Sequence, residues 1–458
     1  MAQEVTVGLD VGTTSVKAVA VDGDGRVLAR ARVPHTLWAT RPGELAHDAD
    51  EAWRRGVTLA LDQLGRDPGA GGRGLLVRAV NVAAMVPSMC AVDRSGRPVS
   101  PGLLYGDDRG GGADAAVDEQ IGEMGGFLRW LVEHHPDAAG YWPAQAVANA
   151  ALADAGGSHR SAAIDTAVAF TSGPLFDRQG WDPRVAATAG LDDVGRLPAI
   201  VAGCEPVGRV ERAGGALLGP GTIDAFGEQL VAGADRPGDV LVILGSTLIV
   251  WVVTREWTEV DGLWTVPHSV PGMVLVGGPS NAGGLFLDWV ARALGADLWS
   301  PGPAVTDPGR VPVWQPYLRG ERVPFHDRGR RASLHDLDIG MGRPELVRAA
   351  FEASAFAVRH IVELSGVEAH RVVATGGGIR NGAWLEALAD GSGLPVDPAE
   401  SPEGAARGAA WLARETSGLE PPGADARRWA RHGARVEPDG RRAIGVEDRY
   451  GRFRQLVG

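Results

Sequence analysis

Hydrophobic and polar residues alternate along the first part of the chain. Residues 5–9 and 16–21 place apolar side chains at every second position, with Gly-Thr-Thr at 12–14 between the two runs. A period of two is typical of a β-strand, and glycine next to small polar residues is typical of a turn. The pattern therefore predicts two strands joined by a tight turn. The turn residues at 22–25 then lead into a third strand at 26–33.

Longer apolar periods indicate helices later in the chain. A proline at 344, apolar residues at helical spacing and a glycine at 366 predict a helix that begins and ends at those signals. By the same criteria we expect further helices at 48–64, 384–390 and 405–414, with Asp48 or Asp50 as N-cap of the first, and strands at 75–86, 240–244, 248–253 and 372–375. Residues 110–165 are weakly patterned, and the chain from 415 onward is rich in Pro and Arg and predicts no element.

The strand–turn–strand pattern of the N-terminus recurs in the middle of the chain. Gly245 lies between the predicted strands 240–244 and 248–253, as Gly12 lies between the first two strands. Aligning the two glycines superposes two hydroxyl residues on two others, although Ile243 then takes the place of Asp10. The repeat predicts two related domains, which we place at 1–236 and 237–458.

Length and charge narrow the class of protein. The chain has 458 residues, with 45 Lys and Arg against 57 Asp and Glu, so the formal net charge is −12. A chain of this length exceeds what one hydrophobic core serves, in line with two domains. The acidic balance argues against a basic nucleic-acid-binding surface, and we expect no nucleic-acid partner.

The sequence also predicts a cytoplasmic protein that does not enter a membrane. Its two cysteines, Cys90 and Cys204, are too few for a disulfide framework or a zinc site. The first residues lack the basic region of a signal peptide. The most apolar stretch, 240–254, is too short and too interrupted to span a bilayer.

The turn after Asp10 is a candidate phosphate site. Gly12 permits close backbone approach, and successive N–H groups with the hydroxyls of Thr13 and Thr14 can surround anionic oxygens. A carboxylate just before such a turn can hold Mg²⁺, directly or through water. The alternative is an ordinary hairpin with a solvated Asp10. The segment is neither a Walker loop nor a dinucleotide fingerprint.

Two further glycine-rich turns offer the same chemistry. Gly245, Ser246 and Thr247 repeat the first turn, and the triplet Gly376, Gly377 and Gly378 follows a predicted strand, with Asn381 shortly after. Each alone could be a flexible turn. A triphosphate bound between two domains would need donors from both of them, which favours a nucleotide site.

Asp224 follows a glycine- and proline-rich turn and opens a predicted helix at 225–232. A carboxylate at a helix start is typically a cap. In a cleft it could instead accept the proton of an attacking hydroxyl, as the catalytic aspartate of kinases does. Its position in the sequence is compatible with both roles.

Seven stretches, taken in order, are similar to the FGGY family of carbohydrate kinases, and most of all to its xylulokinase branch. They are GLDVGTTSVKAVAVD (8–22), HDADEAW (47–53), GTIDAFGEQLVAG (221–233), PGDVLVILGST (237–247), PYLRGERVPFHD (316–327), ATGGGIRNGAWLEALAD (374–390) and EGAARGAAWLA (403–413). The resemblance runs from about residue 5 to 414, and 110–165 matches poorly.

The resemblance implies an α/β protein with two actin-like, ribonuclease-H-like ATPase domains and a cleft between them that closes on its substrates. It implies transfer of the γ-phosphoryl of ATP to a sugar hydroxyl, with Mg²⁺. The first domain would carry the sugar side, and the second the adenosine side. The implied roles are Asp224 as base, Asp10 as the carboxylate near Mg²⁺, Thr13, Thr14 and Lys17 in the first phosphate motif, Gly245, Ser246 and Thr247 in the second, and Gly376, Gly377, Gly378 and Asn381 beside adenosine.

The sugar side departs from the xylulokinase pattern. Met85-Val86-Pro87 stands near the family's Gln-Met-His, Tyr105 replaces a tryptophan, Ala225 follows the base, and Ala46 replaces a glutamate. We expect Met85, Tyr105, Asp224 and Ala225 to line the sugar site. D-xylulose is the first choice of substrate, and other ketoses, polyols and aldonates such as gluconate are alternatives.

Two other classes of function stay open. A non-catalytic sensor of this fold could bind sugar or nucleotide, although it would not need both Asp10 and Asp224. A chaperone or filament ATPase would share the phosphate turns, but it has no evident use for the GERVPFHD segment at 320–327. Kinases that resemble this chain are often dimers, so a homodimer is one expectation.

Overall fold

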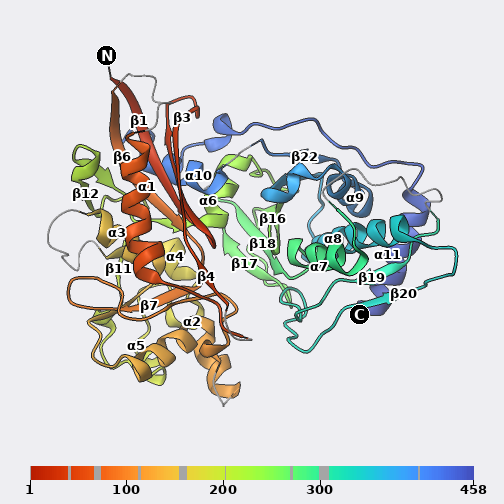
Figure 1. Cartoon of the computed structure of the whole chain (residues 1–458), viewed down its shortest axis with the longest axis horizontal. Helices are drawn as coiled ribbons and strands as arrows, with labels where there is room; N and C mark the ends of the chain where they lie inside the picture. Colours follow the sequence, from red (N-terminus) through yellow and green to blue (C-terminus); the bar gives the residue numbers. More distant parts are fainter. Residues whose placement is uncertain are drawn as a thin grey trace. The chain divides into compact units, whose positions relative to one another are not determined.

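The chain folds into two compact units (Figure 1). The computed structural model describes residues 2–39, 43–66, 74–111, 115–153, 162–201, 203–268, 272–298, 309–400 and 403–458. The first unit is Met1–Val231 with Glu403–Trp429, and the second is Ala232–Pro402 with Ala430–Gly458. The predicted division after 236 placed 403–429 in the second domain, whereas in the structure this segment belongs to the first unit. The cleft between the domains stays a prediction.

The first unit is built on a mixed sheet. Its strands follow the order β12-β13-β6-β1-β2-β3, with β14 also paired to β6. β1 is antiparallel to β2 and parallel to β6, which confirms the predicted hairpin. The bounds are β1 Gln3–Val11, β2 Ser15–Val21, β3 Val27–Pro34, β6 Leu75–Ala84, β12 Gly208–Val210, β13 Ala216–Leu218 and β14 Thr222–Ile223.

Helices cover both faces of this sheet. On one face lies α10, Gly404–Thr416, so close that a Cβ on Gly8 would come within 1.8 Å of one of its carbonyl oxygens. On the other lies α1, Gly56–Leu64, whose first residue contacts Val16. Successive side chains of a strand point to opposite faces of the sheet, and both faces are covered here. β1 is therefore buried on both sides. This packing is the physical reason why α10 belongs to the first unit.

The helix predicted at 48–64 is present in two parts. A π-helical segment, Asp50–Arg55, precedes α1. The side chain of Asp48 accepts the N–H of Glu51 at 3.0 Å, so the first of the two expected caps is the one that is used. Asp50 instead forms ion pairs with Arg54 and Arg55.

A second layer of the first unit contains most of the weakly patterned region. Its strands follow the order β4-β5-β8-β7-β9. A separate core, centred on Phe127, Leu128 and Leu131, joins α2 to β7 and β8. The bounds are β4 Leu37–Trp38, β5 Ala46–His47, β7 Ser88–Val92, β8 Gly102–Leu104, β9 Gly140–Trp142, β10 Ala163–Asp165, β11 Ala199–Val201, α2 Ala115–His134, α3 Ala144–Leu152, α4 Thr166–Phe170, α5 Pro183–Thr188 and α6 Asp224–Ala232.

The second unit has one large sheet with helices packed on it. The strands follow the order β17-β18-β16-β15-β21-β22, and the predicted strands and helices of this unit are confirmed. The bounds are β15 Asp239–Leu244, β16 Leu248–Thr254, β17 Trp264–Pro267, β18 Val274–Ser280, β19 Val313–Gln315, β20 Ser333–His335, β21 Arg371–Thr375, β22 Val396–Pro398, α7 Gly284–Leu294, α8 Arg343–Ser365, α9 Gly382–Ser392 and α11 Ala443–Val457. The sequence did not predict α11.

The two large sheets repeat one topology. In each, a central strand is parallel to a later strand on one side and antiparallel to the next strand on the other: β6-β1-β2-β3 matches β21-β15-β16-β18. The predicted repeat is confirmed, with one difference. Val11 pairs with Val16, whereas Leu244 pairs with Leu248, so the second turn is one residue shorter.

Candidate functional site

Three parallel strands of the first unit end in register at one edge of the sheet. Asp10 on β1 pairs with Ala83 on β6, and Ala83 pairs with Thr222 on β14. Adjacent strands lie about 4.8 Å apart, so β1 and β14 are separated by roughly 10 Å. Just beyond this row come the first turn, Met85 and Asp224. The topology thus gathers at one edge residues that are far apart in the sequence.

Asp10 and Lys17 form an ion pair across the first hairpin. The two residues are partners in the β1–β2 register, and Lys17 Nζ donates to Asp10 Oδ2 at 3.0 Å. Asp10 is buried, with 5% of its surface exposed. Its negative charge raises the pKa of the Lys17 ammonium more than burial lowers it. Lys17 is therefore held as a cation beside the carboxylate.

Asp224 is the first residue of α6 and carries a shifted pKa. Its Oδ1 accepts the N–H of the next residue, Ala225, at 2.7 Å, which orients the carboxylate at the start of the helix. Burial, followed by the negative charge of Asp10, raises the pKa of Asp224 to about 6. A carboxyl group with a pKa in this range is ionised at neutral pH and is still a useful proton acceptor. The bond to Ala225 and proton transfer are thus compatible in this residue.

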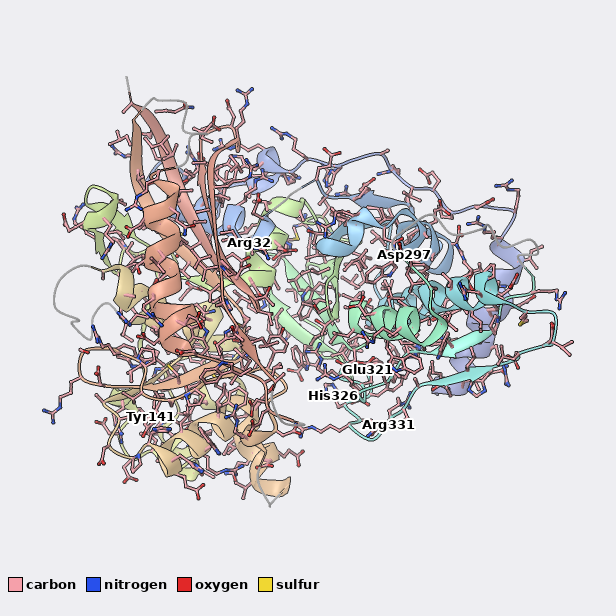
Figure 2. The ribbon with its side chains drawn as sticks, in the orientation of Figure 1. Arg32, Tyr141, Asp297, Glu321, His326 and Arg331 are labelled. Atoms are coloured by element: carbon pink, nitrogen blue, oxygen red, sulfur yellow. The ribbon has the colours of Figure 1, made fainter. Side chains whose placement is uncertain are left out.

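The first turn is closed by its own backbone. The N–H of Gly12 donates to the carbonyl of Ser15 at 3.1 Å, and Thr14 is exposed at the tip. The hydroxyls of Thr13 and Tyr105 lie 3.3 Å apart, which brings together two residues predicted for phosphate and sugar. Arg32, seen on β3 in Figure 2, donates to the Ser15 hydroxyl at 3.2 Å and supports the turn from outside.

His47 supports the same turn, and the sequence had assigned it no role. Its Nε2 donates to the Thr13 carbonyl at 2.8 Å, while the indole N–H of Trp53 donates to His47 Nδ1 at 3.0 Å. An indole can only donate, so Nδ1 carries no proton and the ring is the neutral Nε2–H tautomer. Burial lowers the pKa of His47 to about 4, in agreement. Both residues lie within HDADEAW, one of the stretches that resemble the family, and this was the sequence signal that could have identified them.

The residues predicted for the sugar lie at the same edge of the sheet. Met85 directly follows β6 and is buried, with its carbonyl accepting the Ser88 hydroxyl at 3.1 Å. Ala225 is the second residue of α6, beside Asp224. Tyr105 is partly exposed and contacts Thr13. That they bind a sugar stays a prediction.

The second unit presents its own turn at the end of β15. Gly245 donates to the carbonyl of Thr247 at 3.1 Å, and Ser246 is exposed. Helix α7 starts against this turn, because Gly284 donates to the Gly245 carbonyl at 2.9 Å. A Cβ on Gly283 would lie 2.4 Å from the carbonyl carbon of Thr247. Only glycine permits this contact.

The glycine triplet lies beside the second turn. It follows β21, whose last residue pairs with Ile243 on β15. Gly376 has a φ of 86°, and a Cβ there would come within 2.8 Å of the Leu244 carbonyl oxygen. Gly377 is exposed, and Gly378 packs against Trp384. Gly377 is therefore the exposed backbone of the triplet next to the second turn, and the contact of the triplet with a nucleotide stays a prediction.

Asn381 has a structural role of its own. It caps α9 by accepting the N–H of Trp384 at 3.1 Å, and it donates to the Leu298 carbonyl at 2.7 Å. Both ends of the side-chain amide are thus used within the protein. Its predicted contact with adenosine stays a prediction.

Comparison with known proteins agrees with this geometry. Residues 5–124 match the N-terminal domain, and 240–414 the C-terminal domain, of the FGGY family of carbohydrate kinases, together more than half of the chain. The chain belongs to this family. It is an ATP-dependent carbohydrate kinase with two actin-like, ribonuclease-H-like domains.

Relatives of the chain include kinases with different substrates. It is 28% identical to the xylulose kinase of Streptomyces rubiginosus, over 93% of this chain and 90% of that protein. It is 22% identical to the gluconokinase of Bacillus licheniformis, over 90% and 87%. The crystal structure of xylulose kinase from Rhodospirillum rubrum superposes with a TM-score of 0.82 at 26% identity, covering 99% of this chain and 98% of that one.

Among the helices in the described part of the chain, none is long and apolar enough to cross a bilayer.

Proposed function

We propose that the protein transfers the γ-phosphoryl group of ATP to a hydroxyl of D-xylulose, with Asp224 as the general base. The observation that carries this proposal is the row of strand ends at which Asp10, Met85 and Asp224 meet. It is supported by the pKa of Asp224, raised to about 6, and by the similarity to xylulose kinases.

Asp224 is suited to take up the proton of the attacking hydroxyl. One carboxylate oxygen is engaged by the Ala225 N–H, which orients the group and leaves the other for the substrate. Phosphoryl transfer passes through a loose transition state, so the protein mainly positions the reactants and stabilises charge. Lys17 and the backbone N–H groups of the first turn would supply positive potential for the phosphates.

The residues around Asp10 fit a magnesium ion held chiefly by the nucleotide. Within the described ranges, no group of three or more His, Cys, Asp or Glu side chains could hold a metal by itself. Mg²⁺ is commonly bound by one or two carboxylates, with water and substrate phosphates as the remaining ligands. Asp10 is such a carboxylate, and only its Oδ2 is bonded to Lys17. Mg²⁺ would neutralise charge on the phosphate oxygens of bound ATP.

The choice of sugar depends on the residues near Met85, which differ from the xylulokinase pattern. The test is ADP release from ATP and Mg²⁺ across a panel of ketoses, polyols and aldonates, including gluconate. We expect D-xylulose to give the highest kcat/KM. A different best sugar would correct the substrate. Binding of sugar and ATP without turnover would favour the sensor.

Asp224→Ala run beside the wild type tests the base. Removing a general base typically costs about 10²- to 10⁴-fold in kcat. Asp22→Ala is a matched control, since Asp22 is a buried carboxylate of the same unit whose side chain accepts backbone N–H groups of the 22–26 turn. We expect it to lower stability and leave kcat within about twofold. Comparable loss of kcat in both variants would contradict the assignment of Asp224.

A further inference from the structure

The strand that leads to Asp224 contains a β-bulge. β13 pairs with β6 at Leu218 and Val80, and β14 pairs with β6 at Thr222 and Ala83. Three residues, 219–221, therefore lie opposite two on β6. One extra residue shifts every following side chain to the other face of the sheet. The bulge thus sets Thr222 in the row of Asp10, two residues before Asp224.

We propose that three buried carboxamides, Asn81, Gln145 and Asn149, hold this bulge and so act as positioning residues for Asp224. The inference rests on the proposed role of Asp224 as the general base. It also gives a function to helix α3, in the region of the sequence that had matched the family poorly.

Gln145 connects the two strand ends directly. Its Nε2 donates to the carbonyl of Ala84 at 2.9 Å and to the carbonyl of Thr222 at 3.2 Å. Ala84 is the last residue of β6, and Thr222 is two residues before Asp224. One amide therefore ties the end of the central strand to the backbone that carries the base.

Asn149 lies one helical turn after Gln145 and holds the bulge itself. Residues four apart share one face of a helix, so both amides of α3 face the same loop. Asn149 Nδ2 donates to the carbonyl of Pro220 and to that of Ala163, both at 3.0 Å. It thereby joins the bulge to β10 as well as to α3.

Asn81 holds the bulge from the side of β6. Its Oδ1 accepts the N–H of Gly221 at 2.8 Å and the N–H of Val82 at 3.0 Å. Gly221 has a φ of 96°, so its N–H cannot continue the regular ladder, and the amide takes the place of the missing strand partner. Asn81 thus supplies the hydrogen bond that the bulge removes.

The three amides are sealed from water and packed against the loop. Asn81 is 1% exposed, and Gln145 and Asn149 are 0% exposed. A Cβ on Gly221 would come within 3.2 Å of the Cβ of Gln145, and a Cβ on Gly219 within 2.8 Å of the Cγ of Asn81. Side chains this close restrict the loop to one path. Since β14 is only two residues long and pairs with β6, these bonds are what define where α6 begins.

A double-mutant cycle separates positioning from general damage to the fold. Gln145→Met keeps the length of the side chain and removes the donor, and we expect kcat to fall about 10- to 100-fold. The KM for ATP should change by less than about twofold, because the phosphate turns are untouched. In an Asp224→Ala background, Gln145→Met should change kcat by less than about twofold, since the base it positions is gone.

Two further variants make the test decisive. Thr6→Val removes a buried bond to the Ala410 carbonyl in the same unit, away from the bulge, and should lower the unfolding midpoint while kcat stays within about twofold. If Gln145→Met does not fold, Asn149→Leu takes its place in the cycle.

The outcomes distinguish this inference from the proposed function. Effects that multiply in the double variant, or an unchanged kcat in Gln145→Met, would overturn the positioning role alone. An Asp224→Ala protein with wild-type kcat would contradict the base itself, and the positioning role with it.

Discussion

Asp10 and Lys17 pair across the first hairpin at the two positions that a pair of isoleucines occupies in the second. The ammonium and the carboxylate are 3.0 Å apart, whereas Ile243 pairs with Ile249 at the corresponding place in β15 and β16. The two hairpins share backbone and topology but not this charge pair. The first hairpin therefore carries a carboxylate–ammonium pair, whereas the second carries apolar side chains at the same place.

Removing Asp10 and removing Lys17 should shift the acid side of the pH profile of kcat/KM in opposite directions. Asp10 raises the pKa of Asp224 and Lys17 lowers it, with burial as the largest cause of the shift to about 6. The wild-type kcat/KM should decrease as pH falls through about 6, since the base becomes protonated. Asp10→Asn should move this decrease, the acid limb of the profile, to lower pH, and Lys17→Met should move it to higher pH.

The two shifts are read from the pH at which kcat/KM falls rather than from its maximum, because both variants would also lose the proposed contacts with phosphate or Mg²⁺. Arg32→Met, which removes a neighbouring cation bonded to Ser15, serves as the control and should leave the limb in place. Limbs that move in the same direction in both variants would contradict the proposed electrostatics.

His47 predicts a specific loss of stability in acid. Its folded pKa of about 4 lies below its ordinary value of 6.5, so the unfolded chain binds the proton first as pH falls. His47 therefore costs the protein stability between pH 6.5 and pH 4. His47→Gln keeps a donor for the Thr13 carbonyl and cannot ionise.

The measurement compares denaturant unfolding at pH 7 and pH 5. The decrease in the free energy of unfolding should be smaller in His47→Gln than in the wild type by about 2 kcal/mol. The comparison with the wild type is needed because other groups also titrate in this range. Asp165, Asp224 and Glu321 have pKa values raised to about 6, so their protonation increases the free energy of unfolding as pH falls. Equal decreases in both proteins would show that His47 is not held neutral.

Substituting Gly283 should weaken nucleotide binding selectively. A methyl group there would press on the carbonyl carbon of Thr247 at 2.4 Å, so Gly283→Ala must displace the second turn. The KM for ATP should rise several-fold while the KM for the sugar changes little, as measured by initial rates. Gly451→Ala is the control, because a Cβ there meets nothing within 4 Å, and it should match the wild type.

The C-terminal helix predicts a large loss of stability from one buried ion pair. Arg449 Nη2 donates to Glu352 Oε1 at 2.8 Å and its Nε to Oε2 at 2.6 Å, inside the second unit. Losing Arg449 leaves the buried Glu352 with Arg348 as its remaining partner, at 2.8 Å, so the cost should lie below the roughly 3–5 kcal/mol of a wholly uncompensated buried charge. Arg449→Ala should therefore lower the unfolding midpoint by more than the loss of a surface pair would.

Arg452→Ala is the matched control on the same helix, since Arg452 pairs with Asp336 at the surface. It should change stability by less than about 1 kcal/mol. Equal losses in the two variants would show that α11 is not anchored through Glu352.

The hairpins and the long helix α8 could be predicted because their evidence is local. Period-two patterns, glycine turns, and the signals at Pro344 and Gly366 act within a few residues, and the structure confirms the elements they indicate. Helix α11 could not be predicted in this way. Its side chains Tyr450 and Phe453 are buried against residues far away in the sequence, among them Phe356 of α8.

The residues of the candidate site divide in the same way, into those with a local sequence signal and those without one. Asp10, Thr13 and Asp224 lie in motifs, whereas Gln145 and Asn149 lie in an alanine-rich stretch with no local signature. Their role depends on the bulge in a strand about 70 residues away, and a sequence carries no local signal of such a contact. Glu321, labelled in Figure 2, is similar: it lies in a recognised stretch, yet its bonds to Ser280 and to the N–H of Asn281 became evident only in the structure.

The most direct test of the account is sugar-dependent ADP release by the wild type and by Asp224→Ala, with ATP binding measured in both proteins. The account predicts that one sugar of the panel stimulates ADP release by the wild type. It also predicts that Asp224→Ala loses at least about 10²-fold in kcat while it still binds ATP. An Asp224→Ala protein with near wild-type turnover would contradict the assignment of the base, and Asp224 would then be a helix cap.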